Sequence, residues 1–469
     1  MRERSASARV LCDGEETVHI DGMVPPSPVA AAPSNDVAPA TARTRRVVLA
    51  MLVLAYTFNF LDRQILSILK EPIKQELGLT DTQLGLMGGL AFALLYSTLA
   101  VPIAWLADRM SRTWILTAAL AVWSGFTMLC GAATGFWSLF LSRVGVGFGE
   151  AGGVAPAYSL VSDYFPREQR ARALAVYSFG IPLGSALGLL FGGLIAAYID
   201  WRWAFFLVGG AGVLFAPLFK LAVKDPVRGA LDGAAETAAA AAPPLIAPPL
   251  MAPPFMAVVR TLLPKPTFWL LAFGASSASV CGYGVAFWLP SFFERSLGLD
   301  LAQRSIFYAL IQLIGGTAGI WLGGVIADRL GARNRGAYAL TPAICFLVAL
   351  PIFLLAMNSS SLVWAFLLFL VPTGLNLAWL GPVVTAVQHL TPASMRSTTS
   401  ALFLLVNNLF GIAVGLWLFG FLSDLLAPVH GNESMRWAIY YGSSFWVLAA
   451  LLLWLASKRI GREWVDAAA

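Results

Sequence analysis

The sequence has little charge. Asp, Glu, Lys and Arg make up 12% of its 469 residues, whereas soluble globular proteins carry about 25%. Hydrophobic residues make up 58%, and the mean hydropathy is +0.74. The composition excludes an ordinary soluble domain. It predicts an all-α membrane protein, in which most side chains face lipid or the interior of a helix bundle.

Cysteine and histidine are also scarce, and their positions exclude several kinds of site. The four cysteines are scattered, and three of them fall in apolar segments, which argues against a disulfide framework. The three histidines have no metal-ligand spacing, and only His389 lies near an apolar segment. We therefore expect no metal and no organic cofactor. A lipid-modifying membrane enzyme is disfavoured for the same reason, since no nucleophile–base or metal set is visible.

A nucleotide-binding loop is missing as well. The glycines of Gly145-Val146-Gly147 lie in an apolar segment rather than after a soluble strand, and the sequence contains no GK[ST] motif. Transport driven by ATP is therefore not expected.

What the chain does have is a series of apolar segments of about 20 residues or more, each long enough to cross a hydrocarbon core of about 30 Å. Twelve can be distinguished: 46–76, 83–106, 113–132, 137–162, 171–197, 204–223, 267–295, 304–327, 337–357, 361–388, 399–426 and 436–458. They predict a six-helix bundle over 45–224 and a second over 267–460.

The remaining segments are polar or rich in Pro and Ala. Residues 1–44 are predicted to be a disordered cytoplasmic segment without a cleavable signal peptide. Residues 225–266, which include AAETAAAAAPPLIAPPLMAPP, are predicted to be a cytoplasmic linker between the bundles. Residues 461–469 form a short cytoplasmic tail.

The basic residues are distributed unevenly over the connecting segments. Of the 31 Lys and Arg residues, 23 fall on the side that holds both termini, 6 on the other side and 2 within the apolar segments. This is the positive-inside pattern, so we expect a multi-pass protein of the cell (inner) membrane with both termini in the cytoplasm. The same distribution disfavours a nucleic-acid partner. Nothing in the sequence requires an oligomer, and a monomer is expected.

Two pairs of connecting segments reveal an internal repeat. Ala-Asp-Arg occurs in WLADRMSR (105–112) and again in GGVIADRLGARNR (323–335), 220 residues later. DYFPREQRAR (163–172) and HLTPASMRS (389–397) both carry a Pro followed by Arg, with an offset of 226. The near-equal offsets predict two pseudo-symmetric halves.

These motifs carry a family resemblance. The paired Asp-Arg loops resemble those of the major facilitator superfamily, over about 45–460. Within it the chain resembles the Spinster group in NFLDRQ (59–64), LSRVGVGFGEA (141–151), IPLGSALG (181–188) and DWRWAF (200–205). The resemblance implies the fold of that superfamily and transport of a lysolipid or sphingolipid-like cargo. It also implies a cytoplasmic gate at Asp108, Arg109, Arg112, Asp328 and Arg329, against the simpler explanation that these basic loops only set topology.

Four charges lie deep inside the apolar segments, away from their ends: Asp62, Arg63, Arg143 and Glu150. Charges at this depth are costly and mark a pathway by default. At 1.5 Å per residue, Asp62, Arg63 and Arg143 are expected at a similar level and Glu150 closer to the cytoplasm. We expect Arg63 and Arg143 to bind an anionic head group, and Asp62 and Glu150 to carry the coupling proton. The alternative is a static salt-bridge network that holds two helices together.

The second half carries uncharged candidates instead. Tyr283, Asn376, Trp379 and Asn407 are the substrate-binding candidates, with Trp288 and Asn408 as further possibilities. Ordinary helix packing is the competing explanation for each. A cavity with one charged wall and one aromatic wall would suit an anionic amphiphile that is transported together with protons. Two alternatives stay open: a proton symporter of a small organic acid, and a facilitator without coupling.

Overall fold

Almost every described residue lies in a helix, because backbone groups within lipid must form their hydrogen bonds inside their own segment. The structure is a computed structural model that describes residues 41–107, 109–226, 255–331, 334–392 and 395–465, except the side chains of 167, 168, 171, 255, 323–331 and 397. Most of the predicted N-terminal segment and linker, and the end of the predicted tail, lie outside these ranges.

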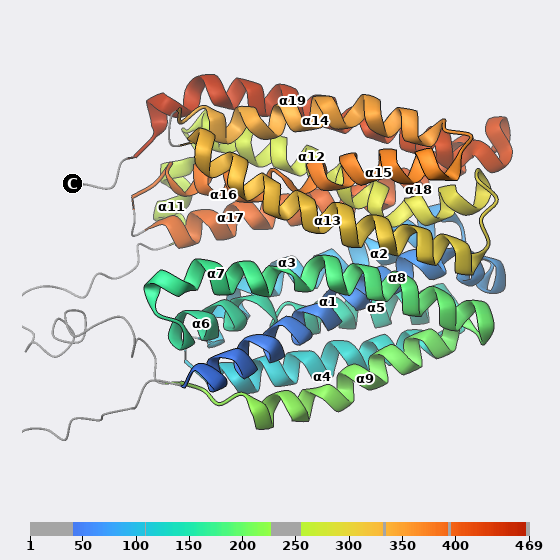
Figure 1. Cartoon of the computed structure of the whole chain (residues 1–469), viewed down its shortest axis with the longest axis horizontal. Helices are drawn as coiled ribbons and strands as arrows, with labels where there is room; N and C mark the ends of the chain where they lie inside the picture. The colour runs from blue at the N-terminus through green and yellow to red at the C-terminus, as the bar shows by residue number, and fades with distance from the viewer. Residues whose placement is uncertain (1–40, 108, 227–254, 332–333, 393–394, 466–469) are drawn as a thin grey trace, which may run out of the picture. The chain divides into compact units, whose positions relative to one another are not determined.

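The described part of the first half forms nine helices that make up six segments of span length (Figure 1). They are α1 (Ala42–Leu77), α2 (Asp81–Gly88), α3 (Leu90–Ala107), α4 (Arg112–Gly131), α5 (Phe136–Glu150), α6 (Val154–Tyr164), α7 (Arg167–Ser178), α8 (Gly180–Tyr198) and α9 (Trp201–Ala222). The pairs α2–α3, α5–α6 and α7–α8 each form one interrupted segment.

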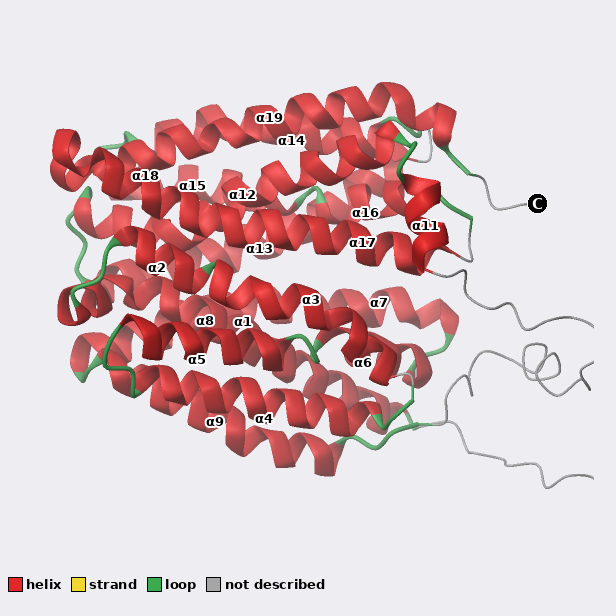
Figure 2. Cartoon of the chain, turned by 180° about the vertical axis from the view of Figure 1, so that it is seen from behind, coloured by secondary structure: helices red, strands yellow, loops and turns green. Residues whose placement is uncertain are grey.

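The second half repeats this plan after the short helix α11 (Phe255–Leu262). Its helices are α12 (Pro266–Arg295), α13 (Leu301–Gly331), α14 (Ala337–Met357), α15 (Leu362–Leu377), α16 (Leu380–Gln388), α17 (Arg396–Asn408), the π-helix η2 (Leu409–Val414), α18 (Gly415–His430), the 3₁₀ turn η3 (Gly431–Glu433) and α19 (Ser434–Glu463). Figure 2 shows the same helices from behind.

Twelve spans follow from these lengths. Ten stretches of the described chain are long and apolar enough to cross a membrane. The last, Thr398–Glu463, has 66 residues; at 1.5 Å per residue it would measure about 99 Å, so it must be two spans, divided at η3. The α5–α6 segment, interrupted at residues 151–153, adds the twelfth. The predicted all-α fold with twelve transmembrane helices is confirmed.

The connections between the described helices lie at two opposite ends of the bundles. We call the end with residues 78–80, 132–135, 199–200, 296–300, 358–361 and 431–433 the hairpin end. The opposite end, where α1 begins and α19 finishes, is the linker end (Figure 1).

The DWRWAF motif holds the first half together at the hairpin end. Asp200 caps α9 by accepting a hydrogen bond from the N–H of Arg202. The indole of Trp201 and the guanidinium of Arg202 both donate to Glu76 near the end of α1, at 2.5 and 2.7 Å. Arg202 also donates to the carbonyls of Gly131 and Ala133 at the end of α4. One motif thus ties together three helix ends.

The two halves meet along helices from both, with α8 beside α13, α2 beside α18 and α1 beside α12. Glycine makes the α2–α18 approach possible. A Cβ on Gly85 would come within 2.5 Å of the Leu416 carbonyl. The halves therefore touch backbone to backbone at this point, as small residues allow in membrane helices.

Candidate functional site

The four buried charges gather between α1 and α5. Arg63 Nε donates to Glu150 Oε2 at 2.7 Å. Asp62, Arg143 and Glu150 are almost completely buried, whereas the Arg63 side chain keeps 14% exposure. Arg143 and Glu150 are the charged groups that act on Asp62, and the hydroxyl of Thr127 is the polar group beside its carboxylate.

Glycines in α5 explain how these charges come together. A Cβ on Gly149 would approach the backbone nitrogen of Trp123 in α4 to 2.5 Å, and one on Gly147 would collide with the Phe92 carbonyl in α3. The run GVGFGE therefore lets α5 lie directly against two neighbouring helices, which brings Glu150 within reach of Arg63. These glycines, which lie in an apolar segment and so do not form a nucleotide-binding loop, have a packing role here.

Aromatic rings surround Arg63. Its guanidinium carbon lies 5.0 Å from the ring centre of Phe60, 4.7 Å from that of Phe92 and 4.6 Å from that of Tyr96. Such contacts favour a cation that has left water. Arg63 also acts electrostatically on the hydroxyl of Tyr283 from the second half. Of the four charges, Arg63 is thus the one that faces the opposite half.

A cavity lies between the halves next to this cluster. It encloses about 1110 Å³ of empty space, including its opening. Phe60 and Gln64 of α1, which flank Arg63 in sequence, line one wall, together with residues of α8. The larger wall comes from α12, α13, α14, α15, α16 and α19. Its polar groups are uncharged.

Three of the uncharged candidates reach this cavity and the others do not. Tyr283, Asn376 and Trp379 line it. Asn407 is buried behind Ser279, a lining residue whose hydroxyl donates to the Asn407 amide oxygen at 2.9 Å. None of the four charges is among the residues that line the cavity. Arg63 lies between the lining residues Phe60 and Gln64 in sequence and acts on the lining residue Tyr283, so contact between any of the four charges and a ligand requires a rearrangement of the site.

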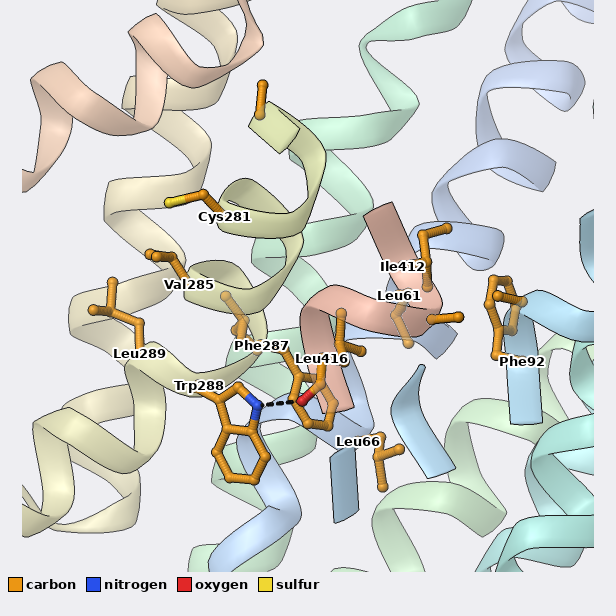
Figure 3. Close-up of a cluster of buried hydrophobic side chains, with 14 of the residues drawn as sticks. Leu61, Leu66, Phe92, Cys281, Val285, Phe287, Trp288, Leu289, Ile412 and Leu416 are labelled. Atoms are coloured by element: carbon orange, nitrogen blue, oxygen red, sulfur yellow. Dashed lines mark hydrogen bonds between the residues drawn. The ribbon is translucent and has the colours of Figure 1, made fainter. Parts of the chain in front are cut away.

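Trp288 has a different position. Its indole donates to the Leu416 carbonyl at 2.8 Å, so it packs α12 against α18 within the second half (Figure 3). Figure 3 also shows Leu61, Leu66 and Phe92 of the first half beside this cluster. Packing is the better explanation for Trp288.

Sequence reasoning missed several polar lining residues. Gln64, Tyr308, Gln312, Thr373 and Trp446 all line the cavity. The Trp446 indole donates to Asn376 Oδ1 at 3.3 Å, which fixes that amide at the wall. The signal was present for Gln64, which follows Asp62 and Arg63 directly. The others sit singly in apolar helices and give no pattern.

A second ionic group, the hairpin-end cluster, joins the two halves. We define it as Glu71, Lys74, Asp81, Thr82, Arg295, Ser423 and Asp424. Arg295 of α12 donates to Glu71 and to Asp81 at 2.6 Å each. Lys74 also donates to Asp81 at 2.6 Å. Asp424 of α18 accepts from the Thr82 N–H and hydroxyl at 2.7 and 2.6 Å, and so caps the start of α2 from the other half.

A third group, the linker-end cluster, joins helices of the first half to Asp225, which directly follows α9. We define it as Arg112, Ser159, Asp163 and Asp225. Arg112, at the start of α4, is buried and donates to Asp163, to Ser159 at 2.9 Å and to Asp225 at 2.8 and 3.0 Å. Burial opposes ionisation of Asp225, but hydrogen bonds from Ser111 and Arg112 lower the pKa of this carboxyl.

The other predicted gate residues contribute less. Arg109 is exposed, and its guanidinium stacks 3.7 Å from the ring centre of Trp105, one turn earlier in the chain. Asp108, and the side chains of Asp328 and Arg329, lie outside the described residues. The gate role of these residues stays a prediction.

Comparison with known proteins agrees with this architecture. The family model described as "Major Facilitator Superfamily" matches residues 52–416. An "MFS-type efflux pump" of Mycolicibacterium smegmatis is 33% identical over 89% of this chain and 94% of its own length. "Protein spinster homolog 1" of Bos taurus is 30% identical over 81% of this chain and 73% of its own length.

A solved structure is similar over nearly the whole chain. It is a crystal structure of a bacterial homolog to the human lysosomal transporter Spinster, in an inward-facing and unoccupied conformation. The two chains are 28% identical, with a TM-score of 0.79, and the match covers 92% of this chain and all of the other.

Proposed function

Because the chain belongs to the major facilitator superfamily, is homologous to the Spinster proteins and is a transporter rather than an enzyme, we propose that it moves an anionic amphiphile of lysolipid or sphingolipid type by alternating access coupled to protons. The observation that carries the proposal is the position of Arg63, a partly exposed cation beside the lining residues Phe60, Gln64 and Tyr283 of a cavity whose other wall is aromatic and uncharged.

This arrangement fits a ligand with two unlike ends. An anionic head group at Arg63 would be held by charge-assisted hydrogen bonds, and the apolar remainder would lie along Leu289, Phe353 and Phe369. Binding sites for apolar ligands commonly combine such walls with a few placed polar groups. Tyr283 and Asn376 would provide these on the far side.

Proton coupling follows from the Arg63–Glu150 bond. A substrate anion competes with Glu150 for the same guanidinium. A buried carboxylate that loses its cation is costly in its charged form, so the substrate favours a protonated Glu150. Asp62, which lies near Arg143 and Glu150, is the second candidate for the proton.

The membrane orientation is part of the proposal. The excess of Lys and Arg at the linker end supports a cytoplasmic position for that end and both termini, by the positive-inside rule. The hairpin end, where ion pairs join the halves, would then be the closed side. That agrees with the similarity to a transporter in its inward-facing conformation.

Efflux of a foreign amphipathic compound is the second candidate. It is favoured by the similarity to the efflux pump of Mycolicibacterium smegmatis. The same cavity would serve, but an uncharged compound would not need Arg63.

Uptake into proteoliposomes separates these possibilities. A radiolabelled lysophospholipid is supplied with and without a pH gradient. We expect wild-type uptake to rise with the gradient, Arg63→Ala to reduce uptake at least about tenfold, and Glu150→Gln to transport without responding to the gradient. Glu76→Gln is the matched control for the change from carboxylate to amide. Glu76 lies on α1, the helix of Arg63, but it binds Trp201 and Arg202 instead.

Other outcomes would redirect the proposal. Uptake that ignores the gradient in the wild type would indicate a facilitator. Inhibition by a hexuronate or aromatic acid, with no lysophospholipid uptake, would indicate a small organic acid symporter. An uncharged compound whose export survives Arg63→Ala would favour efflux.

A further inference from the structure

Lys70 lies in α1 with no exposed surface. Its Nζ donates to the Ser67 carbonyl at 2.9 Å and to the Phe287 carbonyl of the second half. The rings of Phe287 and Trp288 lie 4.5 and 4.7 Å from the same nitrogen. Among the described residues no carboxylate pairs with it. A buried amine at the junction of the two halves is therefore left without a counter-ion.

The acids near Lys70 are already bound to other cations. The charged groups that face it are Glu71 on its own helix, Asp81 on α2, Arg295 on α12 and Arg304 on α13. Arg295 binds both Glu71 and Asp81, and Lys74 also binds Asp81. The two arginines add positive charge around an amine that has no acid of its own.

The bonding pattern of Lys70 fits the neutral amine. A neutral lysine has two N–H groups, and the structure offers two carbonyl acceptors. The aromatic rings would stabilise an ammonium ion, but a desolvated ion without a counter-ion loses more than such contacts restore. Separation of the halves would remove the Phe287 carbonyl and admit water, and an ammonium ion would then be favoured.

Lys70 also occupies an informative place along α1. Arg63, Ser67, Lys70 and Lys74 are spaced by four, three and four residues, so they share one helix face. Lys70 lies about 10 Å along the helix from Arg63 and about 6 Å from Lys74. It stands between the hairpin-end cluster and the Arg63–Glu150 pair.

We propose that Lys70 is a second proton-binding site, which takes up a proton from water when the hairpin end opens and releases it when that end closes. The inference rests on the alternating access and proton coupling of the proposed function. Protonation of Lys70 would oppose closure, so low pH would favour the state that is open at the hairpin end.

The test measures the separation of the halves directly. Spin labels are attached to cysteines at Gln75 (α1) and Val429 (α18), both exposed at the hairpin end, after replacement of the native cysteines. The label distance is measured by pulsed electron paramagnetic resonance in nanodiscs, from about pH 5 to pH 8, where buried lysines titrate. We expect the wild-type distance to lengthen as the pH falls.

Two variants bracket this behaviour. Lys70→Met, which cannot bind a proton, should give the short distance at every pH. Lys70→Arg, which cannot release one, should give the long distance at every pH. A purely structural Lys70 would make both variants shift in the same direction, and a Lys70 that is always charged would make Lys70→Arg resemble the wild type. Either result overturns the proposal.

Control variants separate the role of Lys70 from that of the neighbouring Lys74. Lys74→Met, which removes an ion-paired lysine one turn away, should shift the distances but keep their pH dependence. Should Lys70→Arg not fold, Lys70→Gln serves as a second neutral variant. A pH-dependent distance in either neutral variant contradicts the assignment.

Uptake measurements distinguish a failure of the proposed proton coupling from a failure of the Lys70 assignment alone. If wild-type lysophospholipid uptake ignores the pH gradient and the label distances ignore pH, proton coupling itself fails. If uptake still responds to the gradient in Lys70→Met and its label distances still change with pH, only the Lys70 assignment fails.

Discussion

The hairpin-end cluster and the linker-end cluster use the same residue types at opposite ends of the protein. Each is built around an arginine, Arg295 or Arg112, that binds two acids. They differ in what they connect. Arg295 belongs to the second half and its acids to the first, whereas Arg112 and Asp163 both belong to the first half and Asp225 directly follows its last helix, α9. One cluster therefore joins the halves, and the other joins helices within one of them.

This difference assigns the two clusters different roles. Under the proposed alternating access, bonds within one half would persist while that half moves as a unit, so the linker-end cluster would contribute to folding in every conformation. Bonds between the halves would break when they separate, so the hairpin-end cluster would set the balance between conformations. The gate role of Arg112 stays a prediction, and the bonds that the structure shows for it connect the first half with the segment that directly follows it.

The strongest test of this contrast is Arg295→Ala. The substitution leaves Glu71 and Asp81 buried without their guanidinium, at a cost of about 3–5 kcal/mol to the closed state. We expect a cysteine in place of Ser67, buried at the interface in the wild type, to react with a maleimide at least about a hundredfold faster.

Arg112→Ala is the matched control and should leave that cysteine unreactive. Equal labelling of wild type and Arg295→Ala would show that the hairpin-end cluster does not hold the halves together.

Arg112→Ala should have the next largest effect, on stability alone. It leaves Asp163 and Asp225 without their main cation, but the Asp225 side chain is a quarter exposed, so we expect a loss of about 2–4 kcal/mol in the free energy of unfolding. Thermal unfolding in detergent measures it, with Arg109→Ala, exposed on the neighbouring turn, expected to change stability by less than about 0.5 kcal/mol. A shift in label distances at the hairpin end without a loss of stability would remove the contrast between the clusters.

The sequence predicts the twelve spans because each is a long apolar run bounded by charged or small residues. It does not predict how the four buried charges pair. Depth along straight helices places Glu150 nearer the linker end than Arg63, but the two are bonded. The arithmetic assumes helices that run straight across the membrane. In the structure α1 crosses its bundle obliquely (Figure 1), and a long arginine side chain spans the remaining difference.

Lys70 shows a second limit. Counted along the sequence, it belongs with the basic residues of the hairpin end. Its burial comes from Phe287 and Trp288, more than 200 residues away in the other half. A contact between halves leaves no mark on the periodicity of either helix. The one local hint is the spacing of polar residues from Arg63 to Lys74 on a single face of α1.

The smallest expected effect is the pH dependence of the stability that the Asp225 carboxylate contributes. Because Arg112 and Ser111 lower its pKa in the folded protein, this carboxyl stabilises the fold above its unfolded pKa of about 3.9, and the contribution is lost as the pH falls through the lower, folded value. Partial exposure limits it to about 1 kcal/mol. We expect Asp225→Asn to melt below the wild type at pH 6, and the difference to shrink steadily as the pH falls below about 3.9. A difference that does not change with pH over this range would mean that the substituted amide fails to pack rather than that a charge is missing, and the linker-end cluster would then depend on packing more than on ion pairing.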